Sequence, residues 1–102
     1  MPEFTNGEIL EMVDQFTPKG DRTEVFCGSR PLNVWRKEGD VRVREPATRG
    51  RHEHQFVYLN EADFCYHFRQ FIGIEQVTRD NLVEFLCDLH DRPDRYDAKL
   101  EG

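Results

Sequence analysis

The chain has 102 residues, of which 37 % are hydrophobic and 33 % charged, and its formal net charge is −6. This length predicts one domain with a core large enough to fold without metal or disulfide staples. No apolar run approaches the roughly 18 residues of a membrane-spanning helix, and the N-terminus lacks the basic start and apolar run of a signal peptide. We therefore expect a cytoplasmic protein that does not bind membranes.

Charge is unevenly distributed along the chain. Residues 30–54 hold seven basic side chains against four acidic ones, whereas residues 1–29 hold six acidic against two basic, and residues 60–102 ten acidic against five basic. A surface of one sign steers molecules of the opposite sign toward it. The basic middle and acidic flanks are therefore the strongest indication of binding partners in this sequence.

The three cysteines, Cys27, Cys65 and Cys87, are widely spaced. An odd number at such spacing is more typical of free thiols in a reducing compartment than of a disulfide framework. Cys65 and Cys87 also lie within apolar helical patterns, where a thiol usually behaves as a small buried hydrophobe. We therefore expect reduced, structural cysteines, which agrees with a cytoplasmic location.

The chain begins with the signals of a helix. Thr5 and Glu8 have the spacing of a capping box, in which each side chain accepts a hydrogen bond from the other residue's backbone. Ile9, Val13 and Phe16 recur at i, i+4 and i+7 and would form one apolar face. The proline and glycine that follow predict the end of the helix.

The middle of the chain predicts strands. Residues 23–27 are rich in strand formers, and residues 32–37 and 41–45 predict a hairpin around Gly39, which can supply the positive φ of a tight turn. In the second arm valines alternate with arginines, as in a strand with one buried and one exposed face. Residues 52–59 predict a further strand. Histidine and aromatic side chains share one face, and the other face carries Glu53, Gln55, Val57 and Leu59.

Two helices are predicted in the C-terminal part. Asn60 and Thr78 are placed to cap their N-termini, and Gly73 and Pro93 are placed to end them. The side chains expected to be buried on these helices are those of Phe64, Phe68, Phe71, Ile72, Leu82, Phe85, Leu86 and Leu89.

These elements predict an α+β fold. An N-terminal helix, a small antiparallel sheet of three to four strands and two C-terminal helices would pack with the helices on one face of the sheet. We expect residues 1–93 to form a single α+β domain and residues 94–102 to be a polar C-terminal tail. An uncovered hairpin edge would allow two copies to pair as a homodimer.

The first functional hypothesis concerns the acidic face of the last helix, which consists of Asp80, Glu84, Asp88 and Asp91. Opposite charges steer and align protein partners, so an acidic helix is suited to docking on a basic surface. We therefore expect a non-enzymatic regulator or inhibitor that binds a basic protein partner, such as a nucleic-acid-handling complex. Small accessory proteins of phages and mobile elements are analogous in size and charge. Acidity that merely keeps the protein soluble would leave the same pattern.

The alternative hypothesis is binding of RNA or single-stranded DNA through the arginine-rich hairpin. Arginines that neutralise phosphates, beside an aromatic side chain that stacks on bases, are the parts of a single-strand platform. The candidate contact residues are Trp35, Arg36, Lys37, Arg42, Arg44, Arg49 and Arg51. Pairing of these charges with acids of the same hairpin, and the overall acidity of the chain, would oppose this function.

A small cysteine- or metal-dependent enzyme is the third hypothesis. His52 and His54 lie two apart on a predicted strand, so both could reach one metal ion. A nucleophilic thiol such as Cys27 would need a histidine brought beside it by folding. The chain has no metal, phosphate-loop or nucleophile motif with the required spacing. We therefore predict no enzymatic activity, no cofactor and no catalytic residue.

Overall fold

The structure is a computed structural model that describes residues 4–17, 25–46 and 56–101. Its elements are α1 (Asn6–Gln15), β1 (Val25–Cys27), β2 (Arg30–Lys37), β3 (Asp40–Arg44), β4 (Phe56–Asn60), α2 (Glu61–Ile72), α3 (Arg79–Asp91), the 3₁₀ helix η1 (Pro93–Tyr96) and β5 (Lys99–Glu101). The predicted α+β order is confirmed, with one strand more than the expected three to four. None of the helices within these ranges is long and apolar enough to cross a membrane.

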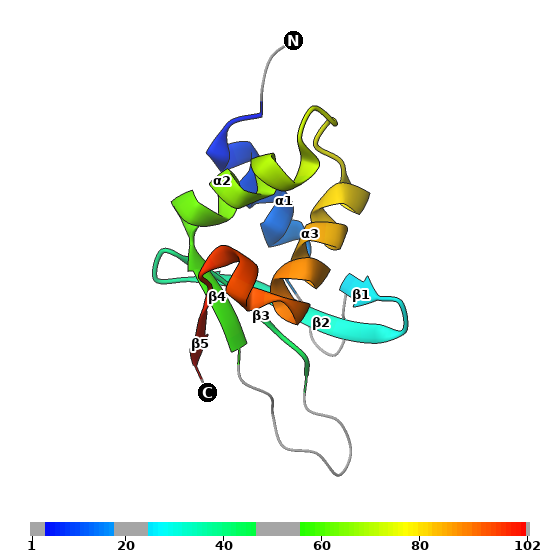
Figure 1. Cartoon of the computed structure of the whole chain (residues 1–102), viewed down its shortest axis with the longest axis vertical. Coiled ribbons are helices and arrows are strands. Elements are labelled where there is room, and N and C mark those ends of the chain that lie inside the picture. Colours follow the sequence, from blue (N-terminus) through cyan, green and yellow to red (C-terminus); the bar gives the residue numbers. More distant parts are fainter. Residues whose placement is uncertain (1–3, 18–24, 47–55, 102) are drawn as a thin grey trace.

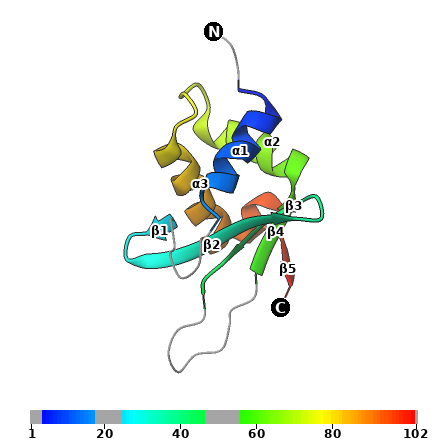
Figure 2. The same cartoon turned by 180° about the vertical axis from the view of Figure 1, so that it is seen from behind.

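The strands form one antiparallel sheet in which their order is the same as in the chain, β1-β2-β3-β4-β5. The three α-helices lie together on one side of this sheet (Figures 1 and 2). The β2–β3 hairpin turns through Glu38 and Gly39, which both have positive φ, as a two-residue turn between twisted strands requires. Neighbouring strands are therefore joined as a simple meander at the centre of the sheet.

One face of the sheet packs against the helices. Side chains alternate along each strand, so Val34 in β2, Val43 in β3 and Val57 in β4 all point into the core. The buried core consists of Ile9, Leu10, Val13, Phe16, Val25, Leu32, Val34, Val41, Val43, Val57, Leu59, Phe64, Cys65, Phe68, Leu82, Phe85, Leu86 and Leu89. The predicted helical stripes are confirmed except at Phe71, which is 39 % exposed, and at Ile72, which is only partly buried.

The predicted helix caps are present. Thr5 Oγ1 accepts a hydrogen bond from the Glu8 backbone N–H at 3.1 Å, and the Glu8 side chain accepts one from the Thr5 backbone N–H at 3.0 Å. Asn60 and Thr78 each accept a hydrogen bond from the backbone N–H three residues on. Gly73, with φ +60°, follows the last residue of α2. Each N-terminal cap stabilises its helix by about 1 kcal/mol.

The segment expected to be a polar tail belongs to the fold. After α3 the chain forms η1 and then β5, which pairs antiparallel with β4. The ring of Tyr96 packs edge-on against Phe85, with centroids 5.2 Å apart. All three residues of β5 are exposed, so no apolar alternation marked this strand in the sequence. The fifth strand therefore lies in residues 94–102, for which the sequence predicts only a polar tail.

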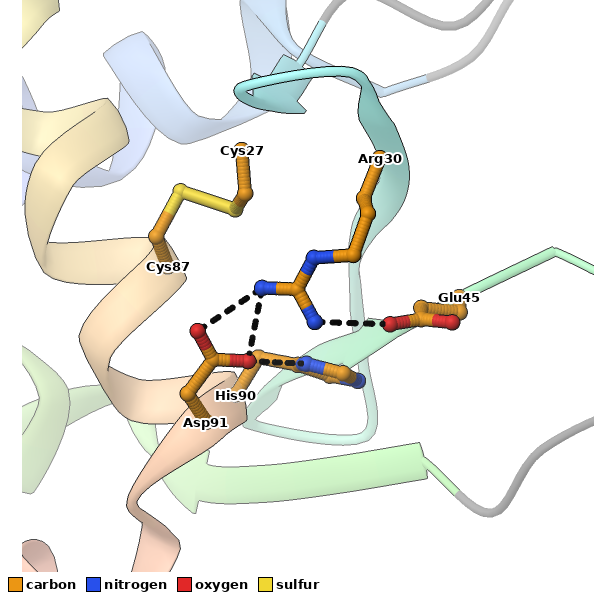
Figure 3. The surroundings of a disulfide bond; sticks show 6 residues. All are labelled: Cys27, Arg30, Glu45, Cys87, His90 and Asp91. Carbon is orange, nitrogen blue, oxygen red and sulfur yellow. Dashed lines mark hydrogen bonds and ion pairs between the residues drawn. A yellow bond between two sulfur atoms is a disulfide. The ribbon is translucent and has the colours of Figure 1, made fainter.

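Cys27 and Cys87 form a disulfide bond that joins β1 to α3 (Figure 3). The expectation of three reduced thiols is therefore wrong, because folding brings together two cysteines that are 60 positions apart. Cys65 is free and buried, as expected, and burial raises the pKa of its thiol. Disulfides are typical of oxidising environments, so the cysteines no longer support a reducing compartment.

Candidate functional site

The sheet face that points away from the helices carries arginines between aromatic rings. Trp35 in β2, Arg42 and Arg44 in β3, and Phe56 and Tyr58 in β4 alternate with the buried residues and so share this face. The strand register places Arg42 between Trp35 and Tyr58. We call these five residues the sheet-face cluster.

The two arginines of the cluster stack on its rings. Cζ of Arg42 lies 4.9 Å from the ring centroid of Phe56 and 6.0 Å from that of Tyr58, and Cζ of Arg44 lies 5.4 Å from the Trp35 ring. The rings of Trp35 and Phe56 meet edge to face, with centroids 5.8 Å apart. Cation–π contacts of this kind hold a guanidinium in one orientation. Both guanidinium groups therefore lie against aromatic rings on this face of the sheet.

Arg42 is largely enclosed by its neighbours. Its side chain is 13 % exposed, and its Nε atom is buried without a hydrogen-bond partner. Its ion pair is with Glu38 at 3.6 Å, and the Glu38 side chain is 74 % exposed. Because the Glu38 carboxylate is largely in solvent and 3.6 Å away, it is held only weakly, and an incoming anion could replace it.

Arg36 does not lie with the sheet-face cluster, although the sequence grouped them together. The alternation of β2 turns Arg36 toward the helical side, where its Nε and Nη2 atoms donate hydrogen bonds to Asp14 at 2.8 and 2.6 Å. Its Nη1 atom donates to Glu61 at 3.2 Å. Arg36 therefore links β2 to α1 and α2 and is not available for a ligand on the opposite face.

Other basic residues border the sheet-face cluster. Lys37 is exposed beside the hairpin turn, and Lys99 in β5 is paired in register with Tyr58. Arg49 and Arg51 lie outside the described residues, in the segment between β3 and β4. The basic residues predicted for the hairpin are therefore divided between the two faces of the sheet. Trp35, Lys37, Arg42 and Arg44 lie on the face away from the helices, and Arg36 lies on the helical face.

The four acidic residues predicted on α3 fall into two groups. Arg30 donates two hydrogen bonds to Asp91 from Nη2, at 2.8 and 2.9 Å, and also binds Glu45 (Figure 3). The hydrogen bonds from Arg30 lower the pKa of Asp91. By contrast, Asp80 and Glu84 are exposed and have no ion pair with any residue that the structure describes.

Asp88 is also engaged within the chain. It accepts hydrogen bonds from Arg92 at 3.0 Å, from Arg95 at 3.3 Å and from the Tyr96 hydroxyl group. Burial opposes ionisation of Asp88, but the hydrogen bonds from Tyr96 and Arg92 and the charge of Arg95 lower its pKa overall. Burial and the bond to Asp88 raise the pKa of Tyr96 to about 12. Asp88 therefore anchors η1 to α3.

The residues of the third hypothesis are only partly described. In the ranges that the structure covers, no three His, Cys, Asp or Glu side chains are grouped to hold a metal ion. His52 and His54 lie outside those ranges. Cys27, the suggested nucleophile, is oxidised in the disulfide and is not a free thiol.

Sequence reasoning missed Phe56 and Tyr58 as members of the site. The alternation of residues 52–59 placed both rings on one face, but it did not identify the neighbouring strand. Pairing of β3 with β4 sets Tyr58 beside Arg42. The alternation within β3 and β4 indicates the cluster only when the two strands are known to be neighbours.

Comparisons of the chain with protein-family models, with curated protein sequences and with solved structures gave no significant match. Functional proposals for this protein therefore depend on the geometry and charge of its own residues.

Proposed function

We propose that the protein binds single-stranded RNA or DNA on the sheet-face cluster, without catalysing a reaction. The observation that carries this proposal is the interleaving of three aromatic rings with two stacked arginines on the sheet face opposite the helices. Sheets with exposed aromatic side chains that stack on bases, beside cationic groups that meet phosphates, are a recurrent way of holding single strands.

Each part of the cluster has a role in this proposal. The partly buried rings of Trp35, Phe56 and Tyr58 would offer their remaining accessible surface for stacking. Each stacked base contributes about 1–3 kcal/mol. Arg42 and Arg44 would bind phosphate oxygens, with Lys99 adding positive charge at the β5 side. Because stacking and phosphate contacts do not discriminate strongly among bases, we expect weak dependence on base sequence.

The net charge of −6 does not exclude this function, because many of the acidic side chains lie on the helices. Two acidic residues, Asp40 of β3 and Glu101 of β5, do share the cluster's face of the sheet. The acidic side chains of α1, α2 and α3 lie on the other side of the sheet (Figure 1). Binding to a polyanion depends on the potential at the contact surface as well as on the net charge. We expect the long-range repulsion to slow association and the local arginines to retain the ligand.

Intrinsic fluorescence provides a direct test, because Trp35 is the only tryptophan in the chain. A base that stacks on this ring should quench its emission, so short oligouridine and oligothymidine can be titrated at several salt concentrations. Replacing two phosphate-binding arginines (Arg42→Gln with Arg44→Gln) should reduce the slope of log affinity against log salt by about 1.4. Tyr58→Ala should weaken binding about fivefold or more through lost stacking.

A matched control is Arg92→Gln with Arg95→Gln. It removes the same charge from exposed positions near the end of α3, away from the sheet-face cluster. Circular dichroism should first establish that all variants are folded. The proposal is wrong if oligonucleotides leave Trp35 emission unchanged at low salt, or if the control pair weakens binding as much as the cluster pair.

The second candidate function is binding of a basic protein partner to the acidic side chains of α3, now restricted to Asp80 and Glu84. Asp88 and Asp91 are neutralised by arginines within the chain, which weakens their part in it. Asp80 and Glu84 are exposed without such partners among the described residues. Glu84 in addition borders an apolar cleft, and this feature favours a specific kind of partner.

A further inference from the structure

An open cleft of about 510 Å³ lies where β1 approaches α2 and α3. Its apolar lining includes Phe26, Phe71, Val83 and the disulfide of Cys27 and Cys87. Phe26 is 51 % exposed and Phe71 39 % exposed, so both rings present apolar surface to the cleft. The volume falls within the range of sites that accept a small ligand or one large side chain.

The border of the cleft is charged. Arg30 is bound to Asp91, and Arg92 is bound to Asp88, so these four lining residues largely compensate one another. Glu84 also lines the cleft, and it is exposed without an ion pair among the residues described. The charge left uncompensated at the border is therefore negative.

We propose that this cleft binds a segment of a partner protein in which an aromatic side chain lies next to a lysine or arginine. The aromatic side chain would pack against Phe26 and Phe71, since aromatic pairs are favourable in edge-to-face and offset geometries. The basic group would meet Glu84, with Asp80 one helical turn away on α3. The unpaired acidic groups make a nucleic-acid strand a poor occupant of the same cleft.

This inference is independent of oligonucleotide binding on the sheet-face cluster, because it uses different residues on α3, α2 and β1. It deepens the second candidate function, to which it gives a defined site and a defined partner chemistry. Aromatic anchors in partly apolar pockets, ringed by charge that aids selection, are the usual centre of protein recognition sites.

Backbone amide chemical shifts of the oxidised 102-residue chain can test the site with three blocked tripeptides. Acetyl-Lys-Phe-Lys-amide should shift the amides of Phe26, Val83 and Glu84 at the lowest concentration. Acetyl-Lys-Ser-Lys-amide lacks the ring and acetyl-Glu-Phe-Glu-amide has the wrong charge, so both should bind more weakly. Glu84→Gln should weaken Lys-Phe-Lys binding about two- to fivefold, as expected for loss of one exposed ion pair.

Variants separate a recognition role from a structural one. Phe26→Ser changes a half-exposed ring on β1 and is preferred to a change at Phe71, which packs 5.5 Å from Phe85. Glu11→Gln, on an exposed position of α1, is the matched charge control and should leave peptide binding unchanged. Glu84→Lys should reverse the preference toward acetyl-Glu-Phe-Glu-amide.

The proposal is overturned if the three peptides bind alike, if the shifts lie away from the cleft, or if Glu84→Gln has no effect. Sedimentation that reveals self-association abolished by Phe26→Ser would assign the cleft to a second copy of the chain and would also overturn it. Phe26→Ser and Glu84→Gln should leave oligonucleotide quenching of Trp35 unchanged. Failure of that quenching in the unmodified protein would refute the sheet-face proposal alone.

Discussion

Reduction of the Cys27–Cys87 disulfide should remove a substantial part of the stability of this domain. The bond closes a loop across 60 positions of sequence. The chain-entropy model gives about 4 kcal/mol for a loop of this length. Small domains are stable by only about 5–15 kcal/mol in total, so this loss is large. After reduction β1 would be held by its pairing with β2 and by the burial of Val25.

Urea unfolding followed by far-ultraviolet circular dichroism, with and without a phosphine reductant, measures this effect. With a urea m-value of about 1–2 kcal/mol/M, the midpoint should fall by about 2–4 M on reduction. Cys27→Ser with Cys87→Ser is the control variant. It should unfold near the midpoint of the reduced protein and should not respond to the reductant.

Thiol labelling identifies the result that would refute this reasoning. Unreduced protein unfolded in urea should take up one alkyl group, on Cys65, and reduced protein should take up three. Labelling of all three thiols without reductant would mean that the bond does not form. An unchanged midpoint after complete reduction would show that the closed loop contributes nothing measurable.

Three further predictions follow from individual residues. Gly39→Ala should destabilise the protein by about 1–2 kcal/mol in urea unfolding, because Gly39 has φ +81°, which a residue with a Cβ adopts only with strain. An added Cβ would meet no atom within 4 Å, so the loss would come from backbone strain alone. A loss near zero would contradict this. The pKa of Tyr96 is raised to about 12, so stability should fall as pH rises from about 10 to 12. Ultraviolet titration should therefore find a late-titrating tyrosine that is absent in Tyr96→Phe. Arg30 lowers the pKa of Asp91, so this carboxylate stabilises the fold above its unfolded pKa of about 4, and its contribution is lost as pH falls through the lower folded value. Asp91→Asn should reduce that acid dependence in unfolding measured across pH, and an unchanged profile would contradict the assignment.

The sequence was sufficient to predict the helices and the central strands of this protein. The Thr5–Glu8 box, the caps at Asn60 and Thr78 and the turn at Gly39 all depend on residues within a few positions of each other. Local hydrogen bonding and backbone conformation are encoded at that range. The alternation in β3 likewise indicated one buried and one exposed face before the partner strands were known.

Tertiary structure alone decided which residues meet across long stretches of chain. It joined Cys27 to Cys87, turned Arg36 toward Asp14, and neutralised Asp91 with Arg30, which is 61 positions away. Periodic patterns specify the face on which a side chain lies, but they do not specify the segment that packs against that face. The candidate site has the same origin, because its rings come from β2 and β4 and its arginines from the strand between them.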